Sequence, residues 1–187
     1  MDNQLNTARS KSDDIGRLDN TTLGQLTHLS EMDDYEIVDG EPDISGWDVR
    51  ASNGDKIGEV EDLLVDSATL RVRYIEVELN KDLVPDNDRR HALIPIGAAR
   101  LNSEKDDVVI NLGSERLLTL PPYVRGTLSR EYEQSIVDGF APASVHVVST
   151  NTERDFYDGE QFDDRRLLEG RRQPAHRDSA YLRRPGT

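Results

Sequence analysis

The sequence contains no cysteine in its 187 residues. Disulfides, thiol catalysis, iron–sulfur clusters and thiolate zinc sites are therefore excluded. Aromatic residues make up 5% and hydrophobic residues 35% of the chain, against roughly 45–50% apolar residues in an ordinary globular domain. No apolar run approaches the roughly 18–20 residues that span a bilayer, and MDNQLNTARS does not resemble a signal peptide. We expect a soluble, acidic, cytoplasmic protein, part of which lies outside any packed core.

Negative charge dominates, and it is unevenly distributed. The formal net charge is −14. Residues 1–43 hold 3 basic and 11 acidic side chains, and residues 150–187 hold 8 of each. Phosphate repels an acidic surface, so we expect no nucleic-acid partner. Only the C-terminal arginine doublets suit anionic lipid headgroups or a charged partner: Arg165–Arg166, Arg171–Arg172 and Arg183–Arg184. A solvated tail with balanced charge is the simpler interpretation.

Strand-like patterns occupy the middle of the chain. Residues 44–51 and 56–66 flank Asn53-Gly54, a strong signal for a tight hairpin. Gly58, inside the second of these strands, indicates a bulge or a close approach of another segment. Further strands are expected over 70–79, 91–96 and 107–112, with Pro95 at a strand end or sheet edge. The short turns and the spacing predict an all-β fold, a small barrel of five or six strands.

The strand predicted over 70–79 changes phase in its middle. Leu70, Val72 and Tyr74 alternate on one face, whereas from Ile75 onward the apolar residues fall on the alternate positions. Such a slip indicates a bulge, or a strand that is buried on both faces.

Four parts follow from these patterns: an acidic arm over 1–43, the barrel over 44–123, a helical or extended segment over 124–149, and an Arg-rich tail over 150–187. Ser114–Leu120 fits a helical turn or a last strand. Leu128, Tyr132 and Ile136 fit one face of a short helix. Residues 1–30 and 150–187 lack periodicity, so we expect them to be disordered or to order only on a partner.

No catalytic signature is present in the sequence, so we expect a protein that is not an enzyme. The histidines at 28, 91, 146 and 176 are isolated from one another. Metal sites usually show local ligand pairs, so we expect surface or structural histidines and no metal site. Glu131 and Glu133 are a possible proton-handling pair, although residues two apart on a helix do not face each other. These features favour an interaction module.

The run WDVRASNGDKIGEVEDLLVDSATLRVRYIEVEL, followed by LIPIGAARL, DVVINL and LPPY, resembles the PRC-barrel superfamily. The resemblance covers residue 44 to about residue 123. One branch comprises the cytoplasmic domains of photosynthetic reaction-centre H subunits, and TLSREYEQSIVDGF resembles the segment that follows their barrel. The other comprises free-standing, stress-associated barrel proteins, which the tail FYDGEQFDDRRLLEGRR resembles more closely.

The first branch implies a non-catalytic H-like subunit at the cytoplasmic face of the photosynthetic membrane. Such a subunit caps the quinone side of the complex, and bacteriochlorophyll and quinone belong to its partner subunits, so this chain itself needs no cofactor. By position after the barrel, Glu131 is the closest match to a proton-delivering acid of this branch, with Glu133 beside it. The histidine pair of that pathway has no counterpart visible in the sequence.

H subunits begin with a transmembrane helix, so this reading implies a separate membrane-anchored H-like polypeptide or docking through protein contacts alone. The second branch implies a cytoplasmic adaptor with no pigment partner. A third reading, an RNA-processing factor, is disfavoured by the acidic charge.

Overall fold

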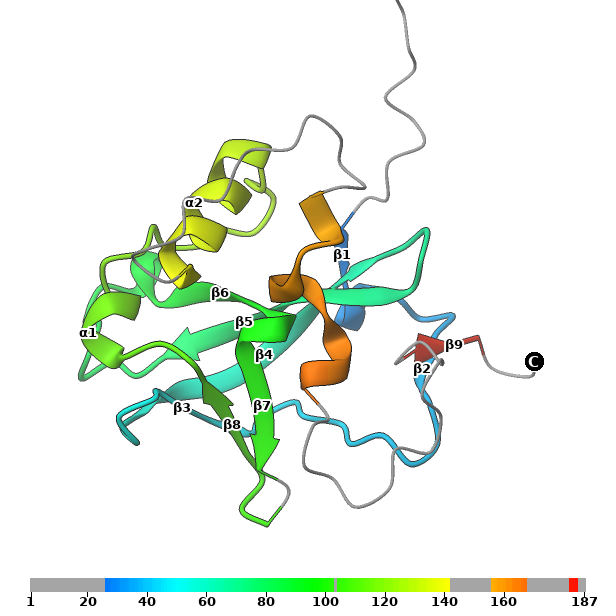
Figure 1. Cartoon of the computed structure of the whole chain (residues 1–187), viewed down its shortest axis with the longest axis horizontal. Helices are drawn as coiled ribbons and strands as arrows, with labels where there is room; N and C mark the ends of the chain where they lie inside the picture. Colours follow the sequence, from blue (N-terminus) through cyan, green and yellow to red (C-terminus); the bar gives the residue numbers. More distant parts are fainter. Residues whose placement is uncertain (1–25, 103, 142–155, 168–181, 185–187) are drawn as a thin grey trace, which may run out of the picture.

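The computed structural model describes residues 26–102, 104–141, 156–167 and 182–184, and Figure 1 shows a curled sheet with one longer helix beside it. The strands are β1 (Leu26–His28), β2 (Glu36–Ile37), β3 (Asp48–Arg50), β4 (Lys56–Asp66), β5 (Arg71–Leu79), β6 (His91–Pro95), β7 (Ala99–Asn102), β8 (Asp107–Ile110) and β9 (Leu182–Arg183). The α-helices are α1 (Ser114–Leu117) and α2 (Arg130–Phe140). The 3-10 turns are η1 (Leu29–Glu31), η2 (Asn87–Arg89), η3 (Ile96–Ala98), η4 (Glu160–Phe162) and η5 (Asp164–Arg166).

The main sheet is mixed. Its path runs β6-β5-β4-β3-β8-β7, and β1 also pairs with β4. All pairs are antiparallel except β3 with β8. The two end strands of the path, β6 and β7, are consecutive in the chain and joined only by η3, so the path returns toward its start as in a barrel. The six strands β3 to β8 confirm the predicted small β-rich domain.

The strands predicted over 56–66, 70–79, 91–96 and 107–112 are confirmed within two residues, whereas the strand predicted over 44–51 is limited to β3 and β7 was not predicted. The Asn53-Gly54 turn is present, with Gly54 at a φ of +90° that favours glycine. Residues 114–117 form the helical turn α1 rather than a strand. The helix expected from Leu128 is α2, whose N-cap Ser129 accepts a hydrogen bond from the backbone N–H of Tyr132 at 3.3 Å.

The phase slip predicted in β5 corresponds to a bulge and also to burial of the strand on both faces. In the pairing with β4, Leu64 lies opposite Tyr74 and Val65 opposite Val72, so Arg73 is the extra residue of a bulge. The strand is also buried on both faces from Val72 to Val77. A second bulge, at Glu61 in β4, turns the next residue inward. Charged side chains therefore enter the interior from the two central strands.

The described parts of both arms pack on the barrel or on each other. β1 joins the main sheet beside β4, whereas β9 pairs with β2 of the N-terminal arm in a separate two-stranded sheet. The 156–167 segment buries Phe156, Tyr157, Phe162 and Leu167 against the core. The expectation that 1–30 and 150–187 order only on a partner is therefore wrong for their described parts. Phe156, Tyr157 and Phe162 supply enough apolar area to hold this segment, although the hydrophobic content of the whole chain is low.

We expect Gly58→Ala to destabilise the domain strongly. A Cβ at this position would overlap the backbone carbonyl oxygen of Glu78 on β5, and neither paired strand can move without losing ladder hydrogen bonds. The expected loss in the free energy of unfolding is roughly 3 kcal/mol, as for severe overpacking. Urea denaturation followed by circular dichroism measures this loss.

Gly113→Ala is the matched control, because the nearest heavy atom to its added Cβ is Ser52 Oγ at 4.0 Å. Its expected cost, from replacing a glycine N-cap, is about 1 kcal/mol or less. Equal costs for the two variants would contradict the close approach of β4 and β5 at Gly58.

Candidate functional site

Two acidic side chains lie directly opposite each other in the centre of the sheet. Asp62 on β4 and Glu76 on β5 are cross-strand partners, and only 6% of Asp62 and none of Glu76 is exposed. Like charges at directly opposite positions destabilise a sheet, and burial increases the cost. Positive or protonatable groups must therefore compensate them.

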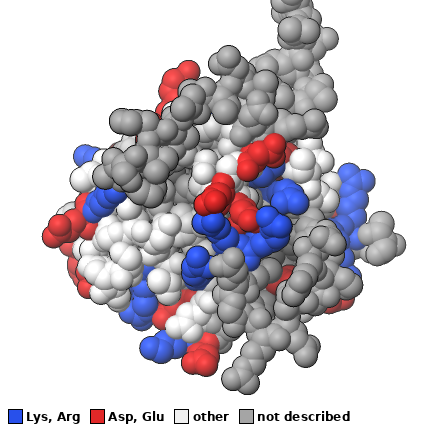
Figure 2. Space-filling model, viewed as in Figure 1, with Lys and Arg blue, Asp and Glu red and all other residues white. Residues whose placement is uncertain are grey.

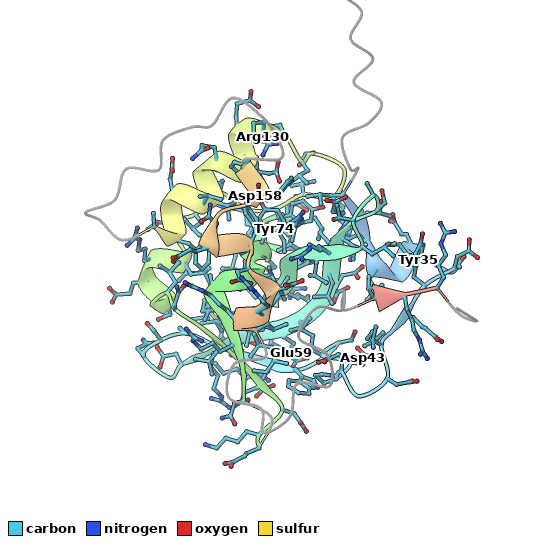
Figure 3. All side chains as sticks on the ribbon, turned by 45° about the vertical axis from the view of Figure 1, so that its right-hand side comes forward. Tyr35, Asp43, Glu59, Tyr74, Arg130 and Asp158 are labelled. Atoms are coloured by element: carbon cyan, nitrogen blue, oxygen red, sulfur yellow. The ribbon has the colours of Figure 1, made fainter. Side chains whose placement is uncertain are left out.

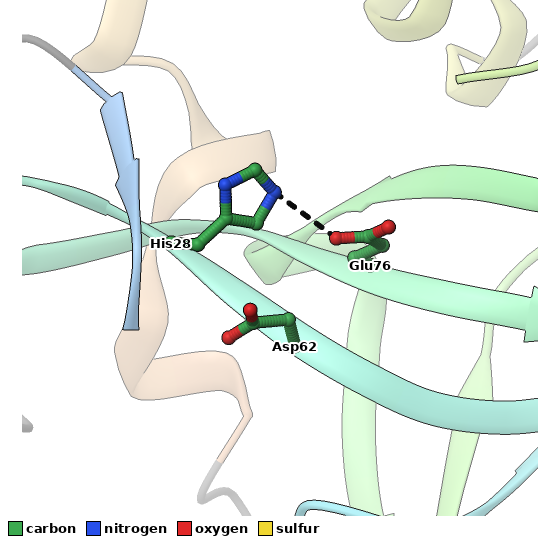
Figure 4. A group of neighbouring side chains, drawn as sticks. All are labelled: His28, Asp62 and Glu76. Carbon is green, nitrogen blue, oxygen red and sulfur yellow. Dashed lines mark ion pairs between the residues drawn. The ribbon is translucent and has the colours of Figure 1, made fainter. Parts of the chain in front are cut away.

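Three such groups surround Glu76 and come from three different parts of the chain. His28 of β1 places Nε2 3.1 Å from Glu76 Oε2 (Figure 4). His91 of β6 places Nδ1 2.9 Å from Glu76 Oε1. Arg125, in the loop before α2, places Nη2 3.0 Å from Glu76 Oε2 and 3.2 Å from Asp62 Oδ2. We name these five residues the Glu76 cluster.

Further hydrogen bonds hold the Glu76 cluster in place. Ser30 donates its hydroxyl hydrogen to Asp62 Oδ2 at 2.6 Å, and the backbone N–H of Leu63 donates to Oδ1 at 2.8 Å. The hydroxyl of Tyr123 lies 3.3 Å from His28 Nε2. Burial and the charge of Glu76 raise the pKa of Tyr123 to about 12, so its hydroxyl stays protonated at neutral pH.

The Glu76 cluster opens to solvent through two of its members. The side chain of Arg125 is 43% exposed and that of His91 is 33% exposed, whereas the others are buried. A fully buried carboxylate is thus linked to the surface by a histidine and an arginine. Carboxylates and histidines in contact can share and pass protons, or can ligate a cation.

A second polar cluster surrounds Glu133 of α2, one of the two predicted proton-handling acids. Its Oε1 accepts hydrogen bonds from the hydroxyls of Tyr74, at 3.1 Å, and of Tyr157. Arg130 Nη1 lies 3.4 Å from Oε2, and the same guanidinium lies 4.0 Å above the ring of Phe156. We name these five residues the Glu133 cluster. Figure 3 shows Tyr74 and Arg130 in this region.

The Glu133 cluster joins the C-terminal segment to the barrel. Tyr74 belongs to β5, whereas Phe156 and Tyr157 belong to the tail. Burial and the nearby Glu133 raise the pKa of Tyr74 well above 10, so its hydroxyl remains a hydrogen-bond donor. Arg73 strengthens the junction by donating to the carbonyl oxygen of Tyr157 at 3.4 Å.

Glu131 and Glu133 lie in different environments, one exposed and one buried, as expected for residues two apart on a helix. Glu131 is exposed, and hydrogen bonds from its own backbone N–H and from Ser129 lower its pKa, so it is ionised at neutral pH. Glu133 is only 5% exposed and faces the tyrosines. The structure does not bring the two carboxylates together, and a role of either in proton uptake stays a prediction.

The sequence predicts that the C-terminal arginine doublets contact lipid or a partner. Those that the structure describes are paired with side chains of the same chain. Arg165 binds Asp163 at 2.7 Å and Arg166 binds Glu160 at 2.7 Å. Arg183 binds Glu36 at 2.9 Å, and Arg184 donates to the hydroxyl of Tyr35 at 3.0 Å. Arg171 and Arg172 lie outside the described residues.

Basic and acidic side chains are correspondingly intermixed on the face that carries the 156–167 segment (Figure 2). Contact of these arginines with lipid or a partner stays a prediction.

Sequence reasoning missed the Glu76 cluster. Its members span residues 28 to 125, and the two histidines are isolated along the chain. The available signal was the phase slip in β5, because a strand buried on both faces must bury some of its charged residues. That slip did not identify Glu76 as the buried residue or His28 and His91 as its neighbours.

The fold and the site together define a small, curled β domain with a buried polar centre. Among the helices that the structure describes, none is long and apolar enough to span a bilayer. Residues 38–117 match the family model of the PRC-barrel domain. The chain therefore contains a PRC-barrel domain, as the sequence resemblance implied.

We expect Glu133→Gln to destabilise the protein and loosen the 156–167 segment. The substitution removes the charge that accepts two tyrosine hydrogen bonds and pairs with Arg130, all in a buried position. Loss of one member of such a network costs about 2–4 kcal/mol. Urea denaturation gives the stability change, and hydrogen exchange at 156–167 reports the segment.

Glu131→Gln, two residues away on the same helix, is the control. This side chain is exposed, so we expect a change within about 0.5 kcal/mol and unaltered exchange at 156–167. The assignment of Glu133 as the anchor is wrong if the two variants have the same stability and exchange.

Proposed function

We propose that this protein is a non-catalytic, H-like subunit that docks on the cytoplasmic face of a photosynthetic reaction centre. The PRC-barrel domain supports this proposal, together with the resemblance of LPPY and TLSREYEQSIVDGF to H subunits. The observation that carries it is the Glu76 cluster. The fold brings His28 and His91 to one buried carboxylate, which supplies the kind of histidine pair that the sequence did not reveal.

The chemistry of the Glu76 cluster suits assistance in proton delivery to a secondary quinone in a partner subunit. Histidines titrate near neutral pH, and carboxylates in contact with them share protons as a group. His91 is partly exposed to water, while Glu76 is wholly buried. In this proposal the Glu76 cluster takes the role that the sequence suggested for Glu131 and Glu133, and those two residues remain candidates, Glu131 at the surface and Glu133 in a buried position.

In this proposal, the protein docks on the reaction centre through the surface of the barrel and through its charged side chains. Bacteriochlorophyll and quinone belong to the partner subunits, and a separate membrane-anchored H-like polypeptide is the candidate anchor. Basic side chains near an anionic membrane contribute about 1 kcal/mol each. The intrachain pairs of Arg165, Arg166 and Arg183 reduce this contribution, so protein contacts carry most of the docking energy.

The second candidate is a free-standing, stress-associated PRC-barrel adaptor in the cytoplasm. The folding of the described arm segments onto the barrel favours it, because β1, β9 and 156–167 find their partners within the chain. Arm segments that are ordered by contacts within the chain do not require a large complex to order them.

An affinity pull-down from native membranes, with an absorption spectrum of the eluate, separates the two candidates. We expect the tagged full-length protein to recover bacteriochlorophyll in stoichiometric amount, and an untagged strain to recover none. A colourless eluate, with the protein found in the soluble fraction, would contradict the reaction-centre proposal and support the adaptor.

A further inference from the structure

Three short contacts within the Glu76 cluster join polar atoms without a hydrogen aligned between them. They are the contacts of Glu76 Oε2 with His28 Nε2 at 3.1 Å and with Arg125 Nη2 at 3.0 Å, and that of Glu76 Oε1 with His91 Nδ1 at 2.9 Å. Glu76 Oε2 and His91 Nδ1 are both buried atoms with no hydrogen-bond partner. In the contact with Arg125 the guanidinium is itself the cation, whereas Glu76 Oε2 and an unprotonated His28 Nε2 each present a lone pair. Two lone pairs that face each other at this distance are stabilised by a cation between them.

The balance of charge in the Glu76 cluster also indicates a binding site for a cation. Asp62 and Glu76 bring two negative charges into the interior, and Glu31 lies 3.9 Å from the other ring nitrogen of His28. Arg125 supplies one positive charge from a side chain that is 43% exposed. The Glu76 cluster is thus a buried site with an excess of donor oxygens over fixed positive charge.

We propose that His28, Asp62 and Glu76 form a binding site for a divalent transition-metal ion of the Zn²⁺ class. One atom from each of the three side chains lies within 4.8 Å of the others. The separation of 3.1 Å between His28 Nε2 and Glu76 Oε2 is close to the roughly 3.3 Å between two ligand atoms of a tetrahedral zinc ion. Figure 4 shows the three side chains, which come from β1, β4 and β5.

The donor set selects the class of metal. One imidazole nitrogen and two carboxylates suit Zn²⁺ and its neighbours, whereas Mg²⁺ and Ca²⁺ prefer oxygen ligands alone. Three protein ligands leave a fourth position for water or a further group. Glu31, 3.9 Å from His28 Nδ1, faces the ring nitrogen that does not ligate the ion, and His91 Nδ1 lies 2.9 Å from Glu76 Oε1, so these two side chains lie around the ligands and orient them.

Arg125 competes with the metal in this proposal. Its Nη2 lies between Asp62 Oδ2 and Glu76 Oε2, at 3.2 and 3.0 Å, and occupies the position of a cation. The side chain is long and partly exposed, so it can swing out and open a path for the ion. Because Arg125 competes with the ion for the same carboxylates, we expect removal of its charge to increase the affinity for the metal.

The test is calorimetric titration of the chelator-treated full-length protein with Zn²⁺. We expect one ion per chain, and far weaker binding of Mg²⁺. Glu76→Gln, nearly isosteric, weakens binding at least about tenfold, since a ligand matters no less than its outer-shell partners. Arg125→Gln tightens binding about fivefold, the size of one partly exposed charge interaction. A gain in affinity cannot arise from misfolding, so this variant keeps the test decisive if Glu76→Gln fails to fold.

Two controls address binding elsewhere on the acidic chain. Glu78→Gln changes a neighbouring acid on the same strand that pairs with Arg90 instead, and it leaves the affinity unchanged. The double variant His146→Gln, His176→Gln removes the two histidines outside the described residues and also leaves the affinity unchanged. Absence of Zn²⁺ binding, unaltered binding in folded Glu76→Gln, or weaker or unchanged binding in Arg125→Gln would each overturn the proposal.

Discussion

The buried pair of opposed carboxylates, Asp62 and Glu76, is the constraint on which much of this structure depends. Two acids placed opposite each other in the centre of a sheet cannot stay ionised there without compensation. The compensation comes from β1, from β6 and from the loop that precedes α2, through His28, His91 and Arg125. The pair therefore helps to fix the positions of an N-terminal strand and of a post-barrel loop, together with apolar contacts such as those of Leu26 and Tyr123.

Glu133 performs a similar task at the other end of the chain. It gathers the hydroxyls of Tyr74 and Tyr157 and the guanidinium of Arg130, and so attaches the 156–167 segment to β5 and α2. Aromatic packing adds to this attachment, because Phe162 meets Tyr74 edge to face at 5.3 Å between ring centroids. A chain with few hydrophobic residues thus closes its core with polar anchors. Both functional proposals require such a rigid body, whether it caps a membrane complex or binds soluble partners.

The sequence was sufficient for those parts of the fold that depend on local patterns. The Asn53-Gly54 turn, the close approach at Gly58 and the bulged strand with both faces buried all follow from neighbouring residues, and the structure confirms them. β1 and β9 could not be predicted, because strands of three and two residues carry no period and exist only through their distant partners. The Glu76 cluster is equally non-local. Its acids look like ordinary alternating surface residues until the register is known.

Arg125 compensates the buried acids Asp62 and Glu76, and the other contacts of the Glu76 cluster depend on this compensation. A double-mutant cycle of Glu76→Gln and Arg125→Gln, measured by urea denaturation in the presence of a chelator, tests this claim directly. We predict that Arg125→Gln costs more in the wild type than in the Glu76→Gln background, with a coupling energy of about 1 kcal/mol or more. Equal costs in the two backgrounds would show that the guanidinium does not hold the carboxylates, and would contradict the account.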